Sequence, residues 1–141
     1  MKLVRSESGV ALVEFAVVLP MLAILLMGII DFGRYMYDSI LAANAARAGV
    51  EYGAQNQVTA ADSAGQEAAA LADAQNLPGL SATPKAPFCM AGGAVVLCGT
   101  SGASYYVEVT TTGTWSPIVK WPGLPATVTV NGSATMRVEQ Q

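Results

Sequence analysis

A single acidic residue, Glu14, interrupts an otherwise uncharged apolar segment. The segment covers residues 10–30, VALVEFAVVLPMLAILLMGII, and Glu14 is the one residue among its 21 that can ionise. On insertion scales a carboxylate at the centre of a bilayer costs roughly 2.5–3.5 kcal/mol, and less near the interface. Glu14 is the fifth residue of the segment, and we expect it to need a positively charged partner or a proton.

The second candidate for chemistry is the pair Cys89 and Cys98, the only two cysteines in the chain. A structural zinc site takes about four ligands, and the chain has no histidine to complete one. The spacing is not that of a C-x-x-C redox motif. Because exported domains commonly carry disulfides, we predict a bond between Cys89 and Cys98 that closes a ten-residue loop.

The remaining polar residues indicate no catalytic site. The acidic residues are scattered, and the serines and threonines have no histidine to act as a base. Charged residues make up only 12% of the chain, the net charge is −3, and there is no basic patch for nucleic acid. The sequence therefore predicts a protein that is not an enzyme, with no cofactor, no metal ion and no nucleic-acid partner.

The apolar segment itself predicts a membrane-spanning helix. A bilayer core about 30 Å thick needs roughly 20 apolar residues, and a helix satisfies its own backbone hydrogen bonds in lipid. A secretory signal peptide is the competing interpretation, but its apolar core is about 7–15 residues long and ends in a small-residue cleavage site. Lys2 and Arg5 precede the segment, whereas Asp31 partly offsets Arg34 after it. This bias places the N-terminus in the cytoplasm and the C-terminal part outside.

The helix is expected to continue beyond the membrane over residues 31–53. Pro20 predicts a kink or local melting inside the span, because proline removes one backbone hydrogen bond. After the span, apolar residues recur at helical steps and form one stripe. That stripe needs cover from the chain's own sheet or from neighbouring subunits. It comprises Phe32, Tyr35, Met36, Ile40, Ala43, Ala46 and Val50.

The rest of the chain predicts a small α+β head. A second helix is expected over 60–75, with Thr59 as its cap and Asp62 as the acid of a capping box. Residues 78–87 read as a loop with three prolines, followed by a sheet over 88–138. Within it, 104–112 is the clearest strand, and 113–125 is a loop that holds Trp115 and Trp121, for which a place in the core is the favoured interpretation. Residues 126–138 are the last β segment, which Asn131-Gly132 could turn into a two-residue hairpin.

Several of these residues together resemble TadE-like proteins, minor components of the tight-adherence (Tad) pilus system in the type IV pilin superfamily. The segment GVALVEF, residues 9–15, is similar to a prepilin processing site, and VEFAVVLP, residues 13–20, is similar to the family's core motif. Similar matches are IDFGR at 30–34, AARAG at 45–49 and SATMRVE at 133–139. The resemblance also implies the fold, a long helix packed on a small antiparallel sheet. It further implies that residues 126–138 are one long bent strand with Gly132 at a bulge, as the alternative to a hairpin.

The resemblance implies a function in assembly. A prepilin peptidase would cut between Gly9 and Val10, so that residues 1–9 are a leader, although a frayed cytoplasmic tail is the alternative. Glu14, Phe15 and Pro20 would then be assembly residues, with Glu14 pairing with the amine of Val10 in the same chain or in a neighbouring subunit. The implied partners are other pilins, an inner-membrane platform and a cytoplasmic ATPase.

The expected location is the bacterial inner membrane, with residues 31–141 periplasmic or extracellular and with the protein either retained in the membrane or incorporated into a pilus. The alternative function is a permanently anchored single-span protein whose exported domain binds another envelope component.

Overall fold

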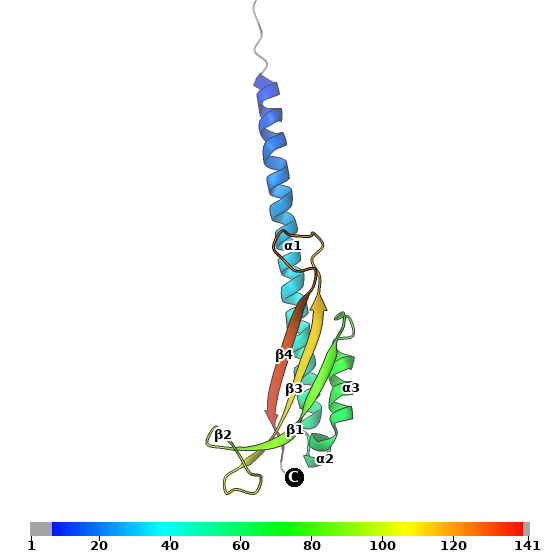
Figure 1. Ribbon diagram of the computed structural model, residues 1–141, viewed down its shortest axis with the longest axis vertical. Coiled ribbons are helices and arrows are strands. Elements are labelled where there is room, and N and C mark those ends of the chain that lie inside the picture. Colours follow the sequence, from blue (N-terminus) through cyan, green and yellow to red (C-terminus); the bar gives the residue numbers. More distant parts are fainter. Residues whose placement is uncertain (1–6, 140–141) are drawn as a thin grey trace, which may run out of the picture.

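The computed structural model describes residues 7–139, and side chains from residue 9. Residues 1–6 of the expected leader lie outside the described part of the chain. The elements in chain order are α1 (Glu7–Gly53), α2 (Gln57–Ala61), α3 (Ser63–Asp73), β1 (Ser81–Ala91), β2 (Ala94–Val96), β3 (Ser104–Trp115) and β4 (Val128–Arg137). The fold is α+β, as the sequence predicts: a long apolar helix leads into a small head of short helices and one antiparallel sheet (Figure 1).

The dominant element is α1, which is 47 residues long and therefore about 70 Å at 1.5 Å per residue. Its first half projects from the head as a bare rod, and its second half packs along the sheet (Figure 1). The local melting that was one of the two expected effects of Pro20 does not occur, since α1 is helical through that residue. Proline removes one hydrogen bond of the ladder, and the turns on either side keep theirs.

Small residues let the sheet approach the second half of α1 closely. Ala42, Ala45 and Ala46 are fully buried, and the hydroxyl of Thr111 in β3 donates a hydrogen bond of 2.6 Å to the backbone carbonyl of Ala42. Gly132 in β4 lies against the same carbonyl, so a side chain there would overlap the α1 backbone. Since interiors are close-packed, these positions fix how near the helix and the sheet can come.

The predicted helix over 60–75 is two helices, because the chain is capped twice. The side chain of Asn56 accepts hydrogen bonds from Val58 and Thr59 and caps α2, so Thr59 is not the cap but the third helical residue. Asp62 then ends α2 and caps α3 by accepting from the backbone N–H of Gly65 at 3.0 Å. The hydroxyl of Tyr52 also donates to Asp62 at 2.8 Å, which ties the caps to α1.

The sheet has the order β2-β1-β3-β4 with antiparallel pairs. The predicted loop over 78–87 is wrong, since β1 begins at Ser81 and includes Pro84 and Pro87. β2 pairs with β1 only from Cys89 onward, so the earlier part of β1 has a neighbouring strand on one side only. Proline is tolerated in such an edge strand because its missing N–H has no strand partner on the open side. The register also shifts between Lys85 and Phe88, around the second proline.

The C-terminal strand β4 is one continuous strand and not a hairpin. Asn131 and Gly132 pair with Thr112 and Thr111 of β3 within an unbroken register. β3 itself runs on to Trp115, three residues beyond the predicted strand end at Thr112. Trp115 is buried against Tyr35 of α1, with ring centroids 5.6 Å apart in an edge-to-face arrangement.

Candidate functional site

The residues predicted for processing and assembly lie together on the bare part of α1. Gly9, Val10, Glu14 and Phe15 are all exposed, and exposure continues to Met27. A shallow apolar surface around Gly9, Val10 and Glu14 is completed by Val13, Val17 and Val18 of the same helix. No other element of the described chain covers these side chains. They are therefore available to lipid or to another protein.

The exposed apolar surface of α1 extends past the predicted span. Phe32, Met36 and Ile40 are 63%, 40% and 58% exposed, and their spacing of four places them on one side of the helix. We call these three residues the open face. The predicted stripe is thus divided: the head buries Ala46 and Val50, whereas the open face has no cover within the chain's described residues.

Asp31, just after the span, accepts hydrogen bonds from several donors in a distant loop. It is 3% exposed, and it accepts from the backbone N–H of Ile118 at 2.9 Å and from the indole Nε1 of Trp121 at 3.0 Å. The backbone N–H of Val119 and the guanidinium of Arg34 lie at 3.5 and 3.4 Å. One carboxylate therefore holds the β3–β4 loop, residues 116–127, on α1 where the bare helix begins (Figure 1).

These donors shift the acidity of Asp31. The backbone N–H of Ile118, followed by the Trp121 indole, stabilises the carboxylate and holds the pKa of Asp31 below its ordinary value of 3.8. Sequence reasoning missed this role, because the donors lie 87 to 90 residues away. The available signal was an acid directly after an apolar span. The two tryptophans therefore have different roles. Trp115 is a core residue, whereas Trp121 is a half-buried donor to Asp31.

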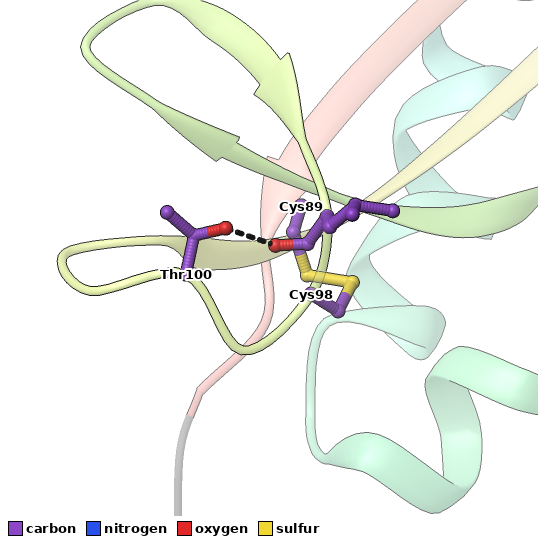
Figure 2. The surroundings of a disulfide bond; sticks show 4 residues. Cys89, Cys98 and Thr100 are labelled. Atoms are coloured by element: carbon purple, nitrogen blue, oxygen red, sulfur yellow. Dashed lines mark hydrogen bonds between the residues drawn. A yellow bond between two sulfur atoms is a disulfide. The ribbon is translucent and has the colours of Figure 1, made fainter.

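The predicted disulfide is present at the end of the head opposite the bare helix (Figures 1 and 2). Cys89 of β1 is bonded to Cys98, which follows β2. Figure 2 shows the Thr100 hydroxyl beside it, donating to the carbonyl of Leu97 at 2.8 Å. The bond closes the β1–β2 hairpin and lies far from both Glu14 and Asp31 along the length of the molecule. Its role is therefore structural support of an exposed edge.

The fold and the exposed helix define a class of protein, a small α+β head on a single apolar helix. Within residues 7–139, α1 is the one helix long and apolar enough to cross a bilayer, and its most apolar window is not buried in the protein. A core helix of a soluble protein would be buried. A cleaved signal sequence would not continue as one helix into the head, as α1 does.

Comparison with protein families gives a match to the N-terminal part of the chain. Residues 9–51 match the model of the TadE-like protein family, which confirms the resemblance over that range. The match begins at Gly9, contains Glu14, Asp31 and the open face, and ends two residues before α1 does. A search of curated proteins and a search of solved structures returned no significant match. The matched family is a pilus-associated one, and the similarity covers α1 and not the rest of the head.

Proposed function

We propose that this protein is a structural minor pilin or pseudopilin that takes part in assembling a Tad-type pilus or a related secretion apparatus. The observation that carries the proposal is the open face of α1. Ile40 lies ten residues beyond Ile30, the last residue of the apolar segment, which is about 15 Å along the helix. Lipid tails around residues 10–30 do not reach that far, so the face needs a protein partner.

A bundle of neighbouring α1 helices would cover this face. Burying apolar side chains such as Phe32, Met36 and Ile40 removes their surface from water, which is favourable by roughly 25 cal/mol per Å². The face continues the exposed surface of residues 10–30 on the same rod, so helices that leave the membrane could pack along both. A protein that stays anchored in the membrane would not need an apolar surface that continues from the span to the open face.

Processing and pairing at the N-terminus complete the proposal. A prepilin peptidase would cut after Gly9, and the new amine of Val10 on one subunit would pair with Glu14 of its neighbour. Opposite charges attract strongly where water is excluded, so the pair would set the register of each incoming subunit. An inner-membrane platform and a cytoplasmic ATPase would drive extraction. The N-terminus would be cytoplasmic, and residues 31–141 would be periplasmic before assembly.

Two kinds of substitution test the proposal in a pull-down with the other pilins of the system. Glu14→Gln keeps the shape of the side chain and removes its charge, and Glu14→Ala removes both. Ile40→Glu places a charge in the open face. We expect all three variants to insert in the membrane and to fold, because the substituted side chains are exposed, but not to join a complex with other pilins.

The matched control is Leu97→Glu, since Leu97 is 85% exposed at the far end of the head. This variant should assemble like the wild type. If Glu14→Gln, Glu14→Ala and Ile40→Glu all assemble normally, neither Glu14 nor the open face is a docking site. The alternative, a permanent anchor whose exported domain binds another envelope component, then gains support.

A further inference from the structure

The β3–β4 loop carries an unusual set of exposed side chains for a water-facing turn. Ile118 and Leu124 are 59% and 51% exposed, Lys120 between them is exposed, and Trp121 is half-buried. The loop also borders an open, mostly apolar groove of about 430 Å³. Its lining is Gly28, Asp31, Phe32, Tyr35, Trp115, Trp121, Leu124 and Val128. The loop is on the side of the head from which the bare helix emerges (Figure 1).

The level of the loop along α1 coincides with the end of the spanning segment. A Cβ placed on Gly28 would lie 3.9 Å from two ring carbons of Trp121, and Gly28 is two residues inside the segment that ends at Ile30. Asp31 holds the loop at this height through Ile118 and Trp121. The loop therefore reaches the last turn of the span and cannot stand clear of a membrane that the span crosses.

We propose that the β3–β4 loop is a second membrane contact, which inserts into the interface of the outer leaflet beside α1. Tryptophan is enriched at membrane–water interfaces, with its indole N–H at the polar level and its ring in the apolar one. Exposed apolar side chains bind the headgroup and acyl boundary in the same way. Ile118, Trp121 and Leu124 supply the apolar contact.

Charge favours lipid over a second protein as the occupant. Lys120 is exposed in the same loop, and the side chain of Arg34 is 45% exposed one turn of α1 beyond Asp31. Asp31, the acid at this level of α1, is buried. The surface presented is thus cationic around an apolar tip, which suits anionic headgroups. The open face at Met36 and Ile40 lies further from the span and remains free for a helix partner.

The proposal is tested with the full chain reconstituted in phosphatidylcholine and phosphatidylglycerol vesicles. Trp115→Phe leaves Trp121 as the reporter, and the change is mild because the buried indole N–H of Trp115 has no hydrogen-bond partner. The lipids carry bromine either near the headgroup or near the bilayer centre. We expect shallow bromine to remove more than half of the Trp121 emission, deep bromine to remove less, and aqueous acrylamide to have little effect.

Two double variants on this background separate insertion from simple proximity. Ile118→Ser with Leu124→Ser should lower bromine quenching and raise acrylamide quenching. Val95→Ser with Leu97→Ser, exposed apolar residues of the far hairpin, should change neither. The proposal is overturned if acrylamide quenches Trp121 fully while bromine does not. It is equally overturned if Trp121 is protected only at high protein-to-lipid ratio, which would assign the loop to contact between two chains.

Discussion

At the residue scale, two acids on one helix have opposite surroundings. Glu14 is exposed on the bare part of α1, where we propose that it pairs with the Val10 amine of a neighbouring subunit. Asp31 is buried and surrounded by donors from a distant loop. A carboxylate that accepts several N–H bonds is stabilised in its charged form. The second acid therefore acts within the fold, and the first is available for the assembly contact that we propose.

The pKa of Asp31 predicts how the head responds to acid. Because its pKa is lower in the folded chain than the ordinary 3.8, Asp31 stabilises the fold above that value and loses this contribution as the pH falls through the lowered pKa. Asp31→Asn lacks this dependence and should melt at lower temperature near neutral pH. Its Tm should approach that of the wild type below about pH 4.

Thermal unfolding in detergent from pH 7 to pH 2, for the wild type and Asp31→Asn, measures this difference. Asp62 also has a lowered pKa, first because of the Gly65 N–H, but it is present in both proteins and does not affect the comparison. A Tm difference that stays constant over the whole range would show that Asp31 does not titrate as described.

At the element scale, the close approach of β4 to α1 depends on Gly132, which has no side chain. A Cβ added to Gly132 would overlap the backbone of Ala42 and Ala43, and Thr111 donates to the same Ala42 carbonyl. The small residues of α1 between 42 and 49 serve the same purpose on the helix side. Packing in this structure thus accounts for the small residues of the AARAG segment, residues 45–49.

Gly132→Ala is predicted to destabilise the head, because the new methyl group would push β4 away from α1. Overpacking of this kind costs about 1–3 kcal/mol. The control is Gly33→Ala, since Gly33 is in α1 and a Cβ added to it would meet nothing within 4 Å, and alanine there should stabilise the helix by up to about 1 kcal/mol. Denaturant unfolding in detergent gives both values. Equal stability of Gly132→Ala and wild type would contradict the close contact.

At the scale of the whole molecule, α1 is long enough to carry an apolar surface from the predicted membrane span to the head. The bare rod and the open face form one apolar surface over residues 10–40, whereas the disulfide and the short helices lie at the other end of the head (Figure 1). Assembly partners would therefore meet the helix, and the far end of the head would remain available on the outside of a complex.

Processing is the prediction that belongs to this scale. If the chain is cut between Gly9 and Val10, the exported protein should begin at Val10, and intact mass and N-terminal sequencing would show it. Gly9→Leu should leave a longer precursor in the membrane, because a bulky residue obstructs close approach of the peptidase. The control Gly33→Ala should be processed normally. An N-terminus at Met1, or one after Gly28, would contradict this prediction.

The sequence by itself determined the features that depend on neighbouring residues. The apolar segment 10–30, the acid at position 14, the cysteine pair and the helical stripe after the span are all local patterns. Periodicity and composition encode such elements directly, and so the long helix, the α+β class, the disulfide and the TadE-like resemblance could be predicted.

Only the tertiary structure decided which surfaces are covered and which are not. β1 tolerates Pro84 and Pro87 because one side of that stretch lacks a strand neighbour, and β4 is a single strand because β3 pairs along its whole length. Asp31 gained its role from donors 87 to 90 residues away. Contacts at such separation are set by packing of the whole chain, which no local pattern contains. The same packing buried Val50 and left Ile40 open.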